Sequence, residues 1–252
     1  MRRWIGILAV FAAACTRTAP RTSTPAHLPG TLALAPISTG NDLDRAIAAA
    51  QEGARLRAND PAAWTALGEA FIELSRRTAD SGLYAQARDA AGRALAIDSR
   101  FVPARRIEAF ALLSDHRFAE AEAAGRALTA EAPEEWRHFA ILGDAQVERG
   151  EYVAAVESYQ KMVDLAQGAP TYSRIAWVRW LAGDPEGAEE MMKAAVESGG
   201  PEEPETWAWC TAELGRLRLM QGRAREALAD FDHAVERFPH HPAALLGRGR
   251  AL

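Results

Sequence analysis

The chain of 252 residues contains only two cysteines, Cys15 and Cys210, so it has no framework of disulfide bonds. Cys210 follows Trp207 and Trp209 in a segment with helical periodicity. A cysteine in such apolar surroundings usually behaves as a small buried hydrophobe. We therefore expect Cys210 to be a buried, unreactive thiol with no nucleophilic role.

The sequence also lacks the common motifs of catalysis: it has no glycine-rich phosphate-binding loop, no zinc-ligand spacing and no nucleophile elbow. His240 and His241 lie between prolines in a predicted turn, and adjacent imidazoles point in different directions, which does not suit a shared metal ion. Glu134 and Glu135 begin a predicted helix, where the helix dipole accounts for carboxylates. We predict that the protein is not an enzyme and has no catalytic residue, no metal site and no cofactor.

Lysine is scarce, because Lys161 and Lys193 are the only two and arginine supplies the other positive charges. The 34 acidic residues outnumber the 29 basic ones, which gives a formal net charge of −5. Proteins that bind nucleic acids present a basic face. The composition therefore argues against a nucleic-acid partner.

What the sequence does contain is an internal repeat. Five alanines recur at spacings of 34, 34, 33 and 39 residues, namely Ala87, Ala121, Ala155, Ala188 and Ala227. Large residues flank them at helical spacing, with Tyr84, Phe118 and Tyr152 on the N-terminal side and Tyr159, Met192 and Phe231 on the C-terminal side. Upstream segments carry a Leu-Gly pair at 67–68, 142–143 and 214–215. Each unit is predicted to be two helices joined by a turn, which bury their apolar faces by stacking on the next unit.

This pattern resembles the tetratricopeptide repeat over residues 42–252, and the cleanest match is residues 134–167. There Phe139, Leu142-Gly143, Tyr152, Ala155 and Tyr159 fall at the family's consensus positions. The resemblance implies an all-α fold, a right-handed α-solenoid of about five full helix-turn-helix repeats with partial terminal units. We expect the repeats at about 61–99, 100–133, 134–167, 168–200 and 201–239, with a partial unit at 240–252. About seven extra residues lie in the first repeat, around 76–82.

The first fourteen residues read as an export signal, with a positive start at Arg2 and Arg3, a short apolar stretch and small residues at 12–14. The segment Ala12-Ala13-Ala14-Cys15 resembles a bacterial lipobox, although Ala12 replaces the usual leucine. The resemblance implies a lipidated Cys15 as the only membrane contact and a periplasm-facing protein of the bacterial cell envelope. Thr16 favours the outer membrane. The alternative is an ordinary secretory signal cleaved at the same bond, which leaves a soluble periplasmic protein.

Residues 15–41 are rich in proline and threonine and have no sustained periodicity, so we expect a flexible tether after Cys15. Leu28 to Ile37 is mildly apolar, which leaves two alternatives: packing on the first helix, or a flexible spacer, which we favour. A helix then begins near Asn41-Asp42 and runs to Ala58. It occupies the place of a repeat's second helix and is predicted to cap the stack.

The resemblance implies that the first helix of each repeat lines a concave groove. The residues in the groove-facing phase are Thr65, Glu69, Ile72, Arg106, Phe110, Leu113, Asp144, Val147, Glu148, Ser173, Arg174, Trp177, Trp180, Arg216 and Met220. Arginine and aromatic side chains are enriched at binding hot spots. We predict a peptide or protein partner held by Phe110, Trp177 and Trp180 as apolar anchors, with Arg106, Asp144, Arg174 and Arg216 as polar contacts. For either tryptophan alone, packing between repeats is an equally good explanation.

The predicted function is a non-enzymatic interaction scaffold at the envelope. One narrower version is an assembly or pilot lipoprotein for an envelope machine, and a small-ligand carrier or an enzyme is the remaining alternative. The last predicted helix begins at Pro242 and carries Leu245 and Leu252 without a second helix to cover them. We expect either a truncated sequence or an end covered by a partner or a second copy. The oligomeric state stays open.

Overall fold

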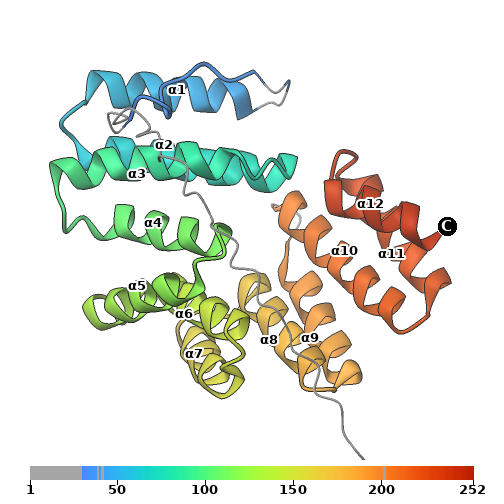
Figure 1. Ribbon diagram of the computed structural model, residues 1–252. Helices are drawn as coiled ribbons and strands as arrows, with labels where there is room; N and C mark the ends of the chain where they lie inside the picture. The colour runs from blue at the N-terminus through green and yellow to red at the C-terminus, as the bar shows by residue number, and fades with distance from the viewer. Residues whose placement is uncertain (1–29, 39, 41–42, 201–202) are drawn as a thin grey trace, which may run out of the picture.

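The computed structural model describes residues 30–38, 40, 43–200 and 203–252, and every regular element in these ranges is an α-helix (Figure 1). The helices are α1 (Leu43–Leu56), α2 (Pro61–Thr78), α3 (Leu83–Ile97), α4 (Val102–Ser114), α5 (Phe118–Glu131), α6 (Trp136–Glu148), α7 (Tyr152–Leu165), α8 (Ala169–Leu181), α9 (Pro185–Ser198), α10 (Pro204–Met220), α11 (Ala224–Arg237) and α12 (Pro242–Ala251). The expected all-α repeat array is confirmed.

Local chemistry accounts for the helix-turn-helix units. Proline lies in the first turn of several helices, where its fixed φ suits the helix and its missing N–H is not needed. The Asp60 carboxylate accepts a hydrogen bond from the Ala62 amide at 2.9 Å and caps α2. Gly150, Gly183 and Gly222 follow first helices with φ between 77° and 81°, a left-handed conformation that favours glycine. These residues end the first helix and reverse the chain into the second.

The repeated alanines lie at the centre of the core. All five are 0 or 1% exposed, so the predicted packing role is confirmed. A Cβ built on Gly68 would lie 3.2 Å from the Ala87 carbonyl oxygen, and one built on Gly215 would lie 3.2 Å from that of Ala227. The two helices of these pairs therefore approach so closely that a Cβ at either position would require the neighbouring helix to shift by a few tenths of an ångström.

The segment before α1 differs from the predicted spacer. The Gln51 side-chain amide donates to the carbonyl oxygens of Ala33 at 2.9 Å and Ala35 at 2.8 Å. The Ala33 amide donates to the Asp89 carboxylate at 2.9 Å, and Ala33 is fully buried. Residues 30–38 therefore pack against α1 and α3, because Gln51 satisfies their backbone. The predictions for the signal, for Cys15 and for the Asn41-Asp42 cap lie outside the described residues.

The helical pairs follow one another along an arc whose two arms approach each other (Figure 1). First helices contact the first helices of neighbouring repeats, α2 with α4, α4 with α6 and α8 with α10, whereas second helices make far fewer such contacts. The first helices therefore lie on the inner side of the arc. We call their exposed side the inner face.

The extra residues of the first repeat lengthen α2 to 18 residues and carry its last turn across to α10. There Arg76 Nη2 donates to Glu205 Oε2 at 2.8 Å, and the Glu205 side chain is only 9% exposed. This ion pair joins the first and fifth repeats directly.

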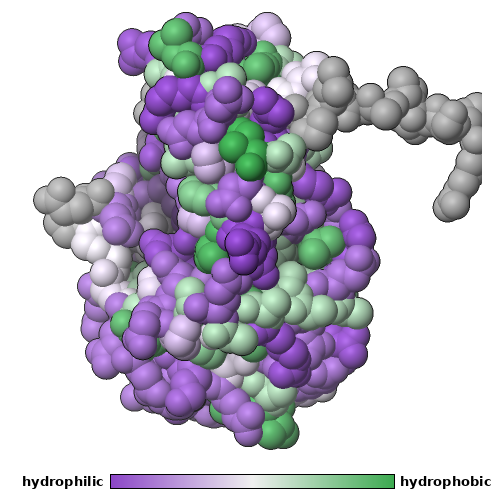
Figure 2. Space-filling model, turned by 90° about the vertical axis from the view of Figure 1, so that its left-hand side faces the viewer, coloured by the Kyte–Doolittle hydropathy of each residue, from purple (hydrophilic) through white to green (hydrophobic). Residues whose placement is uncertain are grey.

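Few large apolar side chains remain at the surface. Figure 2 shows the left-hand side of Figure 1, where hydrophilic residues cover most of the face and hydrophobic ones are scattered in small groups. The exposed apolar side chains include Val153 on α7 and Leu245, Leu246 and Leu252 at α12. Ala244, by contrast, is fully buried, so α12 packs on the stack by one side only.

The close approach in the third repeat gives a testable prediction. A Cβ on Gly143 would collide with the Tyr159 ring, so we expect Gly143→Ala to lose about 1–3 kcal/mol of unfolding free energy. In the matched control Gly53→Ala, the new methyl would meet only the mobile end of Arg57, at 3.5 Å. That variant should gain roughly 0.5–1 kcal/mol from helix propensity. Urea unfolding measures both, and equal effects would contradict the proposed contact.

Candidate functional site

The inner face carries an Arg–Asp pair that joins the third and fourth repeats. Arg174 on α8 donates from Nε and Nη2 to the two carboxylate oxygens of Asp144 on α6, at 2.7 and 2.8 Å. The Tyr159 hydroxyl of α7 donates to Asp144 Oδ1 at 2.8 Å. Burial, reinforced by the Asp144 charge, raises the pKa of Tyr159, so the hydroxyl stays a donor. Burial opposes the charge of Arg174, but Asp144 outweighs it and raises the pKa of Arg174.

A second polar link joins the fourth and fifth repeats. The Trp177 indole N–H donates to Glu213 Oε2 at 3.1 Å. The guanidinium of Arg216 lies over the Trp177 ring at 3.8 Å and donates to the same Glu213 oxygen at 2.6 Å. Stacking on the ring and pairing with the carboxylate hold Arg216 in one place.

Arg106 on α4 forms an ion pair between the first and second repeats, nearer the N-terminal end of the array. It pairs with Glu69 of α2 and lies 3.9 Å from the Glu135 carboxylate at the start of α6. Phe110 packs edge-on against Tyr84, with ring centroids 5.5 Å apart. The three predicted groove arginines are therefore already paired within the chain, and Phe110 takes part in packing.

Three further predicted groove residues, Thr65, Ser173 and Trp180, pack inside the array instead of facing the groove. Thr65 and Ser173 are buried. Their hydroxyls donate to Pro61 O and Pro170 O within the same helix. Trp180 packs against the core that contains Met192. The helical phase was therefore wrong for Thr65 and Ser173, because each side chain turns back onto its own backbone.

Five of the predicted groove residues meet around a pocket between α6, α7 and α8, namely Asp144, Val147, Glu148, Arg174 and Trp177. Ile72, Leu113 and Met220 do not line it. Its volume is about 170 Å³, and it is lined by Asp144, Val147, Glu148, Tyr159, Arg174, Trp177 and Val178. α7 contacts α8 less than the second helices of other repeats contact the helix that follows them, which leaves room for this pocket. Valine and tryptophan side chains together with fixed polar groups are a composition typical of ligand and peptide sites.

Sequence reasoning assigned Tyr159 to packing alone and did not predict Glu213. The Tyr159 ring is indeed buried, but its hydroxyl extends to the pocket. Glu213 lies three residues before Arg216, and this helical spacing is the signal that could have revealed the pair.

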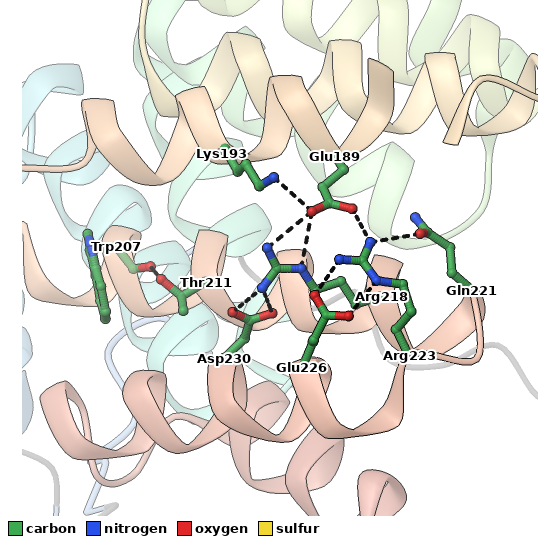
Figure 3. Close-up of polar contacts among 9 residues, drawn as sticks. All are labelled: Glu189, Lys193, Trp207, Thr211, Arg218, Gln221, Arg223, Glu226 and Asp230. Atoms are coloured by element: carbon green, nitrogen blue, oxygen red, sulfur yellow. Dashed lines mark hydrogen bonds and ion pairs between the residues drawn. The ribbon is translucent and has the colours of Figure 1, made fainter. Parts of the chain in front are cut away.

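A larger polar network joins α9, α10 and α11 (Figure 3). Glu189 of α9 accepts from Lys193 at 2.8 Å, from Arg218 at 3.1 Å and from Arg223 at 2.5 Å, while Arg218 also pairs with Asp230 of α11. Burial alone would raise the pKa of Glu189, but these donors outweigh it and lower the pKa to about 2. The charges satisfy one another, so the network clamps the three helices together.

No reactive centre emerges from the described part of the chain. Cys210 is fully buried, as predicted, and burial raises the pKa of its thiol to about 12. His241 is buried and accepts from the Ala244 amide at 3.2 Å, where it caps α12. In the described ranges no group of three or more His, Cys, Asp or Glu side chains is arranged to hold a metal, and none of the helices there is long and apolar enough to cross a membrane.

Comparisons with known proteins agree with this architecture. A family model described as a tetratricopeptide repeat matches residues 108–170 and 213–252. A thermophilic TPR protein of Thermus thermophilus is 22% identical with a TM-score of 0.62, covering 73% of this chain and 98% of that chain. No curated protein matches the chain.

Two further solved structures have the same architecture. PilW, described as a widely conserved type IV pilus biogenesis factor, is 16% identical with a TM-score of 0.56, covering 82% of this chain and 91% of that chain. A chain of the APC/C hetero-tetramer Cut9-Hcn1 is 16% identical with a TM-score of 0.63, covering 83% of this chain and 40% of that chain. At these identities the likeness is one of fold. The chain thus has the fold of a tetratricopeptide-repeat array, an architecture that presents extended concave surfaces for binding.

The network around Glu189 predicts a pH dependence of stability. Its carboxylate titrates with a pKa of about 2 in the folded protein against an ordinary value of 4.5. The stability it contributes is therefore present above about pH 4.5 and is lost as the pH falls toward 2. At pH 7 we expect Glu189→Gln to cost about 2 kcal/mol, because charge-assisted hydrogen bonds from Arg218 and Arg223 are lost. Each arginine keeps its second carboxylate, Asp230 or Glu226.

Urea unfolding of wild type and Glu189→Gln at pH 7 and pH 3 measures this difference. The gap should be narrower at pH 3, and a gap of the same size at both values would contradict the role of the charge. Glu190→Gln is the matched control, because Glu190 is on the same helix with a side chain that is 75% exposed. Its effect should be within about 0.5 kcal/mol of zero at either pH.

Proposed function

We propose that this chain is a non-enzymatic scaffold that binds an extended or helical segment of a protein partner along the inner face. The observation that carries the proposal is the pocket between α6 and α8, where Val147, Trp177 and Val178 lie beside fixed polar groups. Exposed apolar and aromatic surface with a few oriented polar groups is what peptide recognition requires. The concave side of a repeat array offers such a surface over several repeats.

The intramolecular pairs support this proposal, because they hold the pocket walls in position before a partner arrives. Arg174 is fixed by two hydrogen bonds to Asp144, and Trp177 is held between Glu213 and Arg216. A partner does not have to order these side chains, so less conformational entropy is lost on binding. The pairs therefore preorganise the pocket for its partner. Arg174 is less available for a direct contact with the partner than the sequence suggested, because it is already bonded to Asp144.

The proposed location is the bacterial cell envelope, with Cys15 carrying the lipid. This rests on the residues before the described region, above all on Ala12-Ala13-Ala14-Cys15. The fold likeness to PilW is compatible with the narrower function of an assembly or pilot lipoprotein for an envelope machine. A soluble periplasmic scaffold is the alternative, and a small-ligand carrier or enzyme is the less favoured one.

Site-specific crosslinking tests which face binds the partner. Alanine variants of Arg174 or Trp177 also break contacts between repeats, so a photoreactive side chain is a cleaner probe. We expect Val147→benzoylphenylalanine, in the pocket wall, to crosslink partner proteins in envelope extract. The matched variant Val153→benzoylphenylalanine, at a position that is 79% exposed on α7, should not. Crosslinks at 153 but not at 147 would place the binding surface on the outer helices instead.

The anchor has its own test. A buried acyl chain contributes about 0.8 kcal/mol per methylene, so Cys15→Ser should move the protein from the membrane fraction to the soluble fraction. Fractionation followed by immunoblotting measures the shift, with Cys210→Ser as the control that keeps the anchor. Mass spectrometry of the mature wild-type N-terminus that showed an unmodified Cys15 would disprove lipidation.

A further inference from the structure

The pocket contains a carboxylate without a partner. Asp144 and Arg174 line it as a bound pair. Glu148, in the last turn of α6, lines it too and is exposed, but its carboxylate forms no hydrogen bond or ion pair with another described residue. It lies close enough to Tyr159 for its charge to help raise the pKa of that hydroxyl. Glu148 is thus a negative charge at the pocket that is available to a ligand.

The charged side chains that line the pocket carry a net negative charge. The lining residues include two carboxylates, Asp144 and Glu148, against the single guanidinium of Arg174, so their net charge is negative. The nearby Arg216 does not change the balance, because it is paired with Glu213. An acidic partner group would meet arginines that are already bound and would be repelled by Glu148.

The walls of the pocket suit a long side chain with a charged end. Val147, Val178 and the Trp177 ring provide apolar surface. Lysine and arginine lay their methylene stems on such surface while the charged head stays at a polar rim. Trp177 already accepts one guanidinium, because Arg216 lies 3.8 Å from the ring centroid. A volume of about 170 Å³ holds one side chain and excludes a folded segment.

We propose that this pocket receives a lysine or arginine side chain of the partner peptide, with its methylenes against Val147 and Val178 and its charge at Glu148. The inference rests on the proposed scaffold function and adds the chemical class of the partner's anchor residue. It differs from the expectation that the groove arginines themselves supply the charged contacts to the partner. The pocket selects a basic side chain because its one unpaired charge is a carboxylate.

A positional-scanning peptide library on a solid support tests this, with the purified full chain as the probe. Wild type should prefer lysine or arginine at one peptide position over glutamine by about fivefold, as expected for a partly exposed ion pair. The preference should weaken at high salt. Glu148→Gln should abolish it, and Glu148→Lys should reverse it toward glutamate and aspartate. The matched control is Glu157→Gln, at an exposed position of α7 outside the pocket, and it should keep the wild-type preference.

Circular dichroism checks that all variants keep the same helicity. The inference is overturned if wild type prefers acidic residues, shows no charge preference, binds no peptide of the library, or keeps its preference in Glu148→Gln. The scaffold function survives any of these results if position 147 still crosslinks a partner. It fails separately if position 147 crosslinks none.

Discussion

The close approach of the two helices in each pair is the constraint on which the architecture depends. At Gly68 and Gly215 the partner helix brings a backbone carbonyl within 3.2 Å of where a Cβ would lie. At Gly143 the Tyr159 ring occupies that space. Because these sides of the first helices are filled by their partners, only the opposite side is left for the inner face. The positions of Asp144 and Trp177 at the pocket follow from contacts made on the other side of their helices.

Ion pairs between repeats then determine which groups of the inner face stay available to a partner. Arg106 with Glu69, and Arg174 with Asp144, each join the first helices of adjacent repeats. Desolvation offsets much of the Coulombic gain of such half-buried pairs, so their main effect is geometric. The Arg174–Asp144 pair fixes the walls of the pocket, and both pairs neutralise their arginines. The surface that stays available is apolar with a residual negative charge.

The sequence predicted what depends on contacts within a pair. The spacing of Ala121 and Ala155, and Gly143 next to Leu142, are local signals, and they were sufficient for the helix-turn-helix array. The same helical phase brought Val147 and Trp177 to one pocket. Pairing between repeats could not be predicted, because it depends on the rotation of one pair against the next, which side-chain packing sets and no periodicity encodes. The packing of residues 30–38 was only the less favoured alternative for a related reason: Gln51 looks like a solvent-facing residue of α1, yet its buried amide satisfies the backbone of that segment.

The contact between Arg76 and Glu205 has a consequence for the order of folding and for the length of the array. Neighbouring pairs contact each other locally, so a stack of this kind can grow or shorten by a repeat without a change in its rules. Arg76 and Glu205 are 129 residues apart and meet only when every intervening pair is in place with the right curvature. One repeat more or fewer between them would carry the two side chains past each other. This one ion pair therefore depends on the number of repeats that lie between the two side chains.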